Sequence, residues 1–310
     1  MFEHFPIRGH LVHLDAAWRA LIEHAEYPAP IRDTLGEAAA ASLLLAATIK
    51  FEGVLSLQLQ GDGPVHLMLV QCTGGLGVRG LARYRKDELT EAATKAGAAA
   101  GAMTDALAGP ARIVDLIGAG NLTVTLETDD SSQRYQGIVP ITGQRLADSL
   151  QVYFENSEQL PTRLWLHADA QGASGMLLQK LPGAGDLPAQ GGVDLAAVDD
   201  AWRRVQLIAA TLTPEEMRTL TDAEILYRLF NEDDVRLFEP APVYFRCRCS
   251  RERVSGMLKG LGETETRSIL AERGEVEVRC DFCNRAYAFD AVDIGRLFNA
   301  GVASESGSVH

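Results

Sequence analysis

The distribution of cysteines constrains this chain more than any other feature. Four of its five cysteines fall within 37 residues near the C-terminus, as the close pairs Cys247-Arg-Cys249 and Cys280-Asp-Phe-Cys283. Two pairs of thiols that lie far apart in the sequence fit a tetrahedral site in which four thiolates bind one zinc ion. Residues 240–300 contain no histidine, so we expect all four ligands to be cysteines.

Such a zinc ion is predicted to hold structure together rather than to catalyse a reaction. Four protein ligands leave no open coordination position, and about sixty residues with a modest core need a metal to stay folded. Several arginines lie close to the thiols in the sequence. They either favour thiolate over thiol once the metal leaves or simply solvate a small domain. These residues are Arg246, Arg248, Arg251, Arg279 and Arg285.

Composition excludes several classes of protein. The chain has 310 residues, which corresponds to about two domains, with 46% hydrophobic residues, and this argues against wholesale disorder. A net charge of −13 disfavours general binding to nucleic acids or to anionic membranes. The longest apolar run, residues 38–49, is too short to span a bilayer, and the N-terminus does not resemble a secretory signal. We therefore expect a cytoplasmic protein.

Residues 1–181 are expected to form an α+β domain with a mainly antiparallel sheet. Segments with two-residue alternation follow one another across turn sequences such as Gly61-Asp-Gly-Pro64, which is typical of β-hairpins. Residues 92–102 consist almost entirely of small side chains, and no structure is predicted for them. Helices are expected at 14–26, 29–50 and 143–156, and strands at 54–60, 65–72, 78–85, 121–127, 134–141, 162–169 and 174–180.

Residues 182–239 are expected to form a helical linker region. It opens with a stretch rich in glycine and proline, and residues 193–239 carry 5 basic and 11 acidic side chains. Thr213 to Glu216 and Thr221 to Glu224 have the spacing of capping boxes. The helices are too short to be stable alone, so their apolar side chains must pack on another part of the molecule. The apolar residues concerned are Leu220, Ile225, Leu226, Leu229 and Phe230.

Residues 240–300 are expected to form a small third domain around the cysteines, followed by a frayed tail at 301–310. Ser250 is placed to cap a helix that ends before Gly262, and Gly274 is placed to end the next one. The expected elements are helices at 251–261, 264–273 and 291–299, and a hairpin of strands at 275–280 and 285–289.

The cysteine pattern and its surroundings resemble the heat-shock protein 33 family of redox-regulated bacterial chaperones. Beyond Cys-x-Cys and Cys-x-x-Cys, the similarity includes Gln58-Leu-Gln-Gly-Asp-Gly-Pro64, Tyr135-Gln-Gly-Ile-Val139 and Tyr153-Phe-Glu-Asn-Ser-Glu-Gln-Leu-Pro-Thr162. The resemblance implies an N-terminal α+β domain, a helical linker and a C-terminal zinc switch. It implies a chaperone that works without ATP and is inactive while reduced and zinc-bound, rather than an enzyme.

The resemblance also implies how the switch works. Oxidation forms the disulfides Cys247–Cys249 and Cys280–Cys283 and releases zinc, and the oxidised protein dimerises and binds unfolding client proteins. We expect the linker then to loosen and to expose the five apolar residues named above as candidate client-binding residues. Cys72 lies outside the motif and receives no role from the family; its place in an apolar strand predicts a packed side chain.

Two other functions remain open from the sequence alone. Cys280-x-x-Cys283 could belong to a thiol–disulfide oxidoreductase, although such a motif usually opens a helix in a thioredoxin-like context. The four cysteines could also form a nucleic-acid-binding zinc ribbon with a regulatory role. The net charge of −13 disfavours this function, although residues 246–300 alone have 10 basic and 9 acidic side chains, a net charge of +1.

Overall fold

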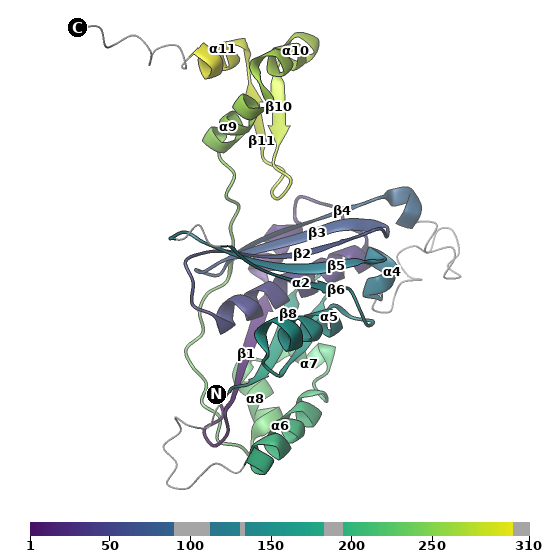
Figure 1. Cartoon of the computed structure of the whole chain (residues 1–310), viewed down its shortest axis with the longest axis vertical. Helices are drawn as coiled ribbons and strands as arrows, with labels where there is room; N and C mark the ends of the chain where they lie inside the picture. Colours follow the sequence, from purple (N-terminus) through teal and green to yellow (C-terminus); the bar gives the residue numbers. More distant parts are fainter. Residues whose placement is uncertain (90–111, 131–133, 183–194, 300–310) are drawn as a thin grey trace, which may run out of the picture. The chain divides into compact units, whose positions relative to one another are not determined.

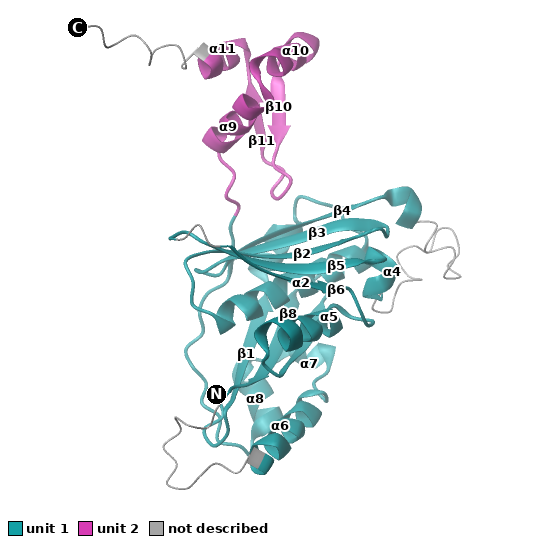
Figure 2. Ribbon diagram, in the orientation of Figure 1, with its two compact units in different colours: residues 1–246 teal, residues 247–310 magenta. Residues whose placement is uncertain are grey.

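The chain forms two compact units, residues 1–246 and residues 247–310 (Figure 2). The structure is a computed structural model that describes residues 1–89, 112–130, 134–182 and 195–299. The expectations for 92–102, for most of the glycine-rich start of the linker and for the tail at 301–310 therefore lie outside the described residues. The mixed α+β class with antiparallel sheets is confirmed.

The first unit contains a six-stranded sheet with the order β6-β5-β2-β3-β4-β9 (Figure 1). All neighbours in this sheet are antiparallel except β4 and β9. The alternating segments and turn sequences predicted five of these six strands, all except β9, with each strand end placed within one residue. The strands are β2 (Gly53–Gly61), β3 (Val65–Thr73), β4 (Gly77–Tyr84), β5 (Gly120–Thr128), β6 (Arg134–Pro140) and β9 (Tyr244–Phe245).

A second, three-stranded sheet has the order β1-β8-β7, with β1 (Ile7–Leu14), β7 (Thr162–Ala168) and β8 (Ala173–Lys180). Helix α2 (Ala29–Thr48) packs against strands of both sheets. Its alanine-rich sequence is buried on nearly every side, as expected for a helix with two apolar neighbours. Strand β8 is also buried on both faces, because α2 covers one face and the linker helices cover the other.

The prediction for the N-terminal region was partly wrong. Residues 7–14 form strand β1, which was not predicted, and the helix expected at 14–26 is only α1 (Ala16–Ile22).

The helix expected at 143–156 is α5 (Leu146–Tyr153), followed by a π-helical turn, η1 (Phe154–Glu158). The Asp148 carboxylate accepts hydrogen bonds from the backbone N–H groups of Gln144 and Arg145, which fixes the start of α5. A short helix, α4 (Ile113–Ile117), precedes β5.

Three linker helices cover the far face of the three-stranded sheet: α6 (Leu195–Ala209), α7 (Pro214–Thr219) and α8 (Asp222–Phe230). Both predicted capping boxes are confirmed, since Thr213 Oγ1 accepts from Glu216 N–H and Thr221 Oγ1 accepts from Glu224 N–H. The helices form an apolar cluster of their own with β1 and β8. Its sheet residues include Ile7, Met176 and Leu178.

The second unit is small and agrees with the predicted elements. It contains α9 (Arg251–Leu261), α10 (Glu263–Arg273), the hairpin of β10 (Val276–Arg279) and β11 (Ala286–Phe289), and α11 (Ala291–Asn299). Ser250 caps α9, and Gly274 ends α10 with φ +81°, a left-handed conformation that suits glycine. Six buried side chains form the core: Val254, Leu258, Val276, Tyr287, Phe289 and Ile294.

Candidate metal centre

The four C-terminal cysteines meet at one point of the second unit. Cys247 and Cys249 lie in the extended segment before α9, while Cys280 and Cys283 lie in the turn that joins β10 to β11. The four Sγ atoms all lie within 4.8 Å of one another, and together they could hold a metal ion. The sequence predicted this set of residues, and the fold brings all four together.

The spacing of the sulfurs fits tetrahedral coordination. The Sγ atoms of Cys247 and Cys280 are 3.6 Å apart, and those of Cys249 and Cys283 are 3.4 Å apart. Four sulfurs at about 2.3 Å from a common centre lie about 3.8 Å from one another in an ideal tetrahedron. The observed separations are close to this value and longer than the ~2.05 Å of a disulfide bond, so the four cysteines are free thiols.

The turn that carries Cys280 and Cys283 points backbone donors at the sulfurs. Cys280 Sγ receives hydrogen bonds from the backbone N–H groups of Phe282 and Cys283, and Cys283 Sγ receives one from Arg285. Asn284 has φ +52°, and its N–H donates to the Cys280 carbonyl at 2.8 Å, which closes the turn. Amide donors of this kind stabilise negative charge on thiolates.

The thiols of the centre differ in acidity. Burial raises the pKa of Cys283 to about 12 and also raises that of Cys280. Burial acts in the same direction on Cys247, but hydrogen bonds, led by the Cys249 N–H, lower its pKa to about 7. Of these three thiols, Cys247 is therefore the one most readily ionised near neutral pH. Because metal ions bind thiolates, ligation must displace the remaining protons.

Tyr287 is a contact of the centre that the sequence did not reveal. Its hydroxyl donates a hydrogen bond to Cys249 Sγ at 3.2 Å, and its ring is part of the buried core of the second unit. The only sequence signal was an inward position on a strand directly after the second cysteine pair. Tyr287 therefore contacts both the apolar core of the unit and one of the clustered cysteines. Residues that contact metal ligands in this way commonly fix the orientation of those ligands.

The arginines near the cysteines have different partners. Arg285 is hydrogen-bonded to Tyr287, and that bond together with charge on Cys249 and Cys283 raises the pKa of its guanidinium. Arg251 instead pairs with Asp293 and lies over the Phe289 ring. Arg279 pairs with Glu277 on the same strand. Of these three arginines, Arg285 is the one whose guanidinium interacts electrostatically with the cysteine sulfurs.

The candidate client-binding residues lie in the first unit, in the cluster between the linker helices and the three-stranded sheet. Ile225, Leu229 and Phe230 are buried there, and Leu220 and Leu226 are half-buried against the same cluster. The expectation that these apolar side chains pack on another part of the molecule is therefore confirmed, and that part is the three-stranded sheet of the first unit. The Phe230 ring meets the Phe2 ring edge-on at 5.1 Å, which also connects α8 to the N-terminal segment.

Cys72 is fully buried on β3, away from the other cysteines in the core of the first unit. Burial raises the pKa of its thiol to about 12, so it stays protonated at neutral pH, as predicted for a packed side chain. Cys280-x-x-Cys283 lies between two strands and does not open a helix, unlike the motif of thioredoxin-like enzymes. Every helix in the described ranges is too short or too polar to cross a membrane.

Comparison with known proteins identifies the family. A family model described as Hsp33 protein matches residues 1–290. The 33 kDa chaperonin of Nitrosococcus oceani is 45% identical over 302 residues, which cover 97% of this chain and 93% of the relative. That of Methylobacillus flagellatus is 41% identical over 310 residues, which cover 100% of this chain and 96% of the relative.

A solved structure supports the same assignment at the level of the fold. The crystal structure of the 33 kDa chaperonin from Thermotoga maritima, a heat-shock protein 33 homologue, matches with a TM-score of 0.76. The match covers 97% of this chain and 96% of that chain at 23% identity. The resemblance found in the cysteine motifs thus extends over the whole length, and this chain belongs to the heat-shock protein 33 family of chaperones.

Proposed function

We propose that this protein is a redox-regulated holdase that binds unfolding proteins without using ATP. The observation that carries the proposal is the convergence of four free thiols in a small unit whose apolar core consists of six buried side chains. In the reduced state the thiolates bind one zinc ion and the protein is inactive. Oxidation releases the zinc and activates the protein. The proposed parts are an α+β chaperone domain (residues 1–181), a helical linker region (residues 182–239) and a zinc-binding switch domain (residues 240–300).

Zinc is the metal that the donor set favours. A site of four thiolates in tetrahedral arrangement suits Zn²⁺, and it leaves no position for a substrate. Cys247, Cys249, Cys280 and Cys283 would hold the ion, with Tyr287 donating to one of the sulfurs. The metal would supply much of the folding free energy of the second unit, on the order of 10 kcal/mol for structural zinc sites.

Oxidation is proposed to join near neighbours, Cys247 with Cys249 and Cys280 with Cys283, as the family resemblance implies. Four thiolates give up four electrons to two molecules of peroxide, which take up protons and leave as water. In the folded unit the sulfurs of Cys249 and Cys283, which belong to different pairs, are 3.4 Å apart. Once the unit unfolds, however, each short pair closes a much smaller loop than any bond between the pairs, at a lower entropic cost.

The linker helices are proposed to loosen when the zinc unit unfolds. Helices α7 and α8 have 6 and 9 residues, too few to be stable without the sheet beneath them. Their release would expose Leu220, Ile225, Leu226, Leu229 and Phe230 to unfolding proteins. We propose that the activated protein acts as a homodimer in the cytoplasm, where a four-cysteine zinc site stays reduced until oxidants appear.

The test follows zinc content and client aggregation in parallel while peroxide is added. We expect zinc release and suppression of aggregation to rise together without ATP, and to reverse on reduction with added zinc. Cys280→Ser should bind zinc at least about 100-fold more weakly, because it removes one of four ligands, whereas Cys72→Ser should keep wild-type affinity. Full zinc retention by Cys280→Ser, or activity that is independent of oxidation, would refute the proposal.

A further inference from the structure

Strand β1 has one open edge in the described part of the chain. There it pairs with β8 on one side only, and it is the last strand of its sheet on the other side. Leu181 N–H donates to the Pro6 carbonyl, which fixes the hydrogen-bonding phase of the antiparallel pair. The backbone N–H and C=O groups of every second residue from Pro6 onward therefore point toward β8. The backbone groups of the intervening residues Gly9, Leu11 and His13 point away from β8, toward the open edge. Among the described residues, these three backbone positions have no hydrogen-bond partner.

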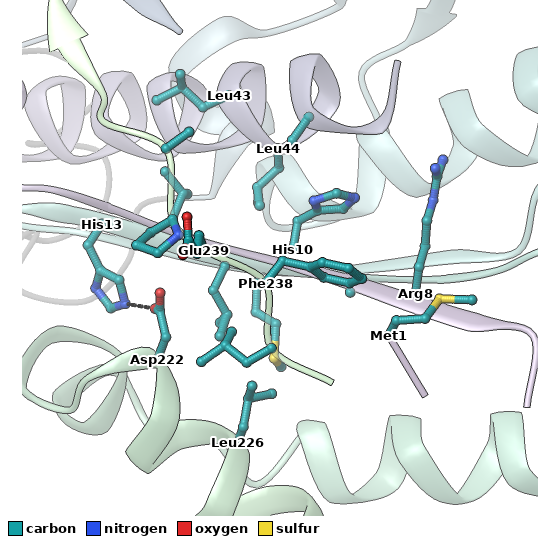
Figure 3. A pocket seen from close by; sticks show the side chains of 18 of the residues that line it. Met1, Arg8, His10, His13, Leu43, Leu44, Asp222, Leu226, Phe238 and Glu239 are labelled. Carbon is teal, nitrogen blue, oxygen red and sulfur yellow. Dashed lines mark hydrogen bonds and ion pairs between the residues drawn. The ribbon is translucent and has the colours of Figure 1, made fainter. Parts of the chain in front are cut away.

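The open edge faces an apolar cavity of about 860 Å³ (Figure 3). Residues 8–13 of β1 line it, the C-terminal end of α2 lies on one side with Leu43 and Leu44, and α8 lies on the other with Leu226. A strand added at this edge would have side chains of alternating residues directed toward α2 on one face of the sheet and toward the face that α8 covers in this conformation on the other. Cavities of this size are large enough for several apolar side chains.

Residues 237–243, here called the strap, close the cavity from the fourth side. Within the described part of the chain the strap makes no backbone hydrogen bond, and Pro240 and Pro242 have no N–H to donate. Leu237 and Phe238 remain 53% and 62% exposed although they line an apolar cavity. The strap therefore covers the β1 edge without pairing with it and without filling the space beneath.

The strap is held at its two ends. Before it, Val235 forms a β-bridge with Phe2, and Arg236 N–H donates to the Met1 carbonyl at 2.9 Å. After it, β9 pairs with β4, and Arg246 N–H donates to the Val78 carbonyl at 2.9 Å. The next residue is Cys247, the first of the four clustered cysteines. One anchor of the strap thus adjoins the metal centre directly in the sequence.

We infer that the open edge of β1 is a docking site for an extended apolar segment of an unfolding protein, which adds to the sheet as a strand after the strap leaves. The strap shows which occupant fits, because it is itself a largely apolar stretch of polypeptide without helix or strand structure that lines this cavity. Unpaired backbone groups of an edge strand recognise any extended chain regardless of its sequence, which suits a chaperone. This inference rests on the proposed holdase function and specifies where the client binds.

The polar groups of the groove are compatible with an apolar strand. Burial, with a smaller contribution from the Arg8 charge, lowers the pKa of His10 to about 4, so its ring is neutral at physiological pH. The His10 Nε2 atom is buried without a hydrogen-bond partner, and it offers a contact to a polar group on an incoming chain. His13 is paired with Asp222 of α8 at 3.0 Å, so that pair must part if α8 moves away.

The test blocks one unpaired N–H of the edge in the full-length protein. Leu11→Pro removes an N–H that pairs with nothing in the sheet, and an edge strand tolerates proline at such a position. Leu11→Ala removes the same side-chain packing but keeps the N–H, so it is the matched control. The probe is reduced and carboxymethylated α-lactalbumin, which stays unfolded, and its affinity is measured on peroxide-activated protein.

We expect Leu11→Pro to bind the probe about tenfold more weakly than Leu11→Ala, through one lost hydrogen bond and the obstructing ring. Equal affinities would overturn the β1 site while leaving the holdase function intact. If activated wild-type protein does not bind the probe at all, the proposed function itself fails.

A second measurement needs no variant. Residue-resolved hydrogen exchange on activated wild-type protein should show protection of the Gly9, Leu11 and His13 amides only when the probe is bound. Unchanged exchange at these three amides with bound probe would overturn the site even if Leu11→Pro failed to fold.

Discussion

The two units of this chain reach stability in different ways. In the first unit, two sheets enclose α2 in a continuous apolar core, and a further apolar cluster lies beneath the linker helices. In the second unit, the apolar core consists of only six buried side chains, and the same small unit holds the four free thiols. Burial alone can hold the first unit together, whereas a core this small normally needs a metal.

The linker helices occupy an intermediate position in this comparison. Helices α7 and α8 have capped starts, and the apolar residues of the linker helices are buried against one another, against the three-stranded sheet and against Phe2. Their stability therefore depends on a surface that the rest of the first unit keeps in place. From this comparison we expect the parts of the chain to unfold in sequence, with the metal unit first and the main core last.

The largest expected effect is that of metal removal under reducing conditions. A strong chelator should unfold residues 247–299, because the lost metal contributes on the order of 10 kcal/mol, while residues 1–180 stay folded. Residue-resolved hydrogen exchange measures both units in one sample. Keeping the thiols reduced separates the effect of the metal from that of disulfides. Retained protection in the second unit would show that its apolar core suffices, and the contrast between the units would disappear.

The next effect concerns the linker helices. Ile225→Ala removes a fully buried side chain from α8 and should destabilise the docked helices by about 2–5 kcal/mol. We expect residues 195–230 to lose exchange protection while zinc stays bound, and the holdase to need less oxidant. Tyr227→Ala on the same helix is the matched control, since Tyr227 is 74% exposed. Global unfolding of the first unit by Ile225→Ala would show that the linker is an inseparable part of its core.

A smaller effect is expected at the edge of the metal centre. Tyr287→Phe keeps the buried ring but removes the hydrogen bond to Cys249 Sγ, and it should weaken zinc binding about tenfold. Competition with a chromophoric chelator measures the affinity. Tyr227→Phe, which changes an exposed tyrosine of the first unit, should have no effect. Unchanged affinity in Tyr287→Phe would mean that the cysteines alone fix the geometry of the site.

Local signals made much of the second unit and the linker predictable. Ser250, Gly262 and Gly274 mark the ends of α9 and α10, and the threonine–glutamate pairs mark the starts of α7 and α8. The four cysteines were predicted as one site because few other arrangements use two close pairs of thiols. For the helix ends, the interactions that decide the structure are made within a few residues of the signal, whereas the two cysteine pairs, about thirty residues apart, are joined by a donor set that is itself distinctive.

Features that depend on distant parts of the chain were missed. Strand β1 has polar residues on both faces, such as His10 and His13, and it is a strand because β8 pairs with it and helices cover both sides. The strap and its cavity exist only because the N-terminal segment and β4 hold residues 235–246 from two sides. The contact of Tyr287 with Cys249 likewise requires the hairpin to bring the two together.

The smallest expected effect compares one kind of helix cap in the two regions. Thr221→Ala removes the oxygen that caps α8, and Ser250→Ala removes the one that caps α9, each at a cost of about 1 kcal/mol. In the reduced protein the first change should increase the opening of α8 about fivefold in hydrogen exchange. The second should weaken zinc binding by a similar factor without visible opening, because the bound metal leaves the second unit with stability in reserve.

Acid should destabilise α8 through Glu224, separately from the Thr221 hydroxyl oxygen that caps the helix. The Glu224 carboxylate accepts a hydrogen bond from the Thr221 backbone N–H, which lowers the pKa of Glu224 below its usual 4.5. The folded helix therefore gains stability from ionised Glu224 above pH 4.5, and loses it as the pH falls through the lowered pKa. Glu224→Gln should remove this part of the pH dependence while Thr221→Ala retains most of it. If α8 opened equally at pH 4 and pH 7 in wild-type protein, the reciprocal cap would contribute nothing to linker docking.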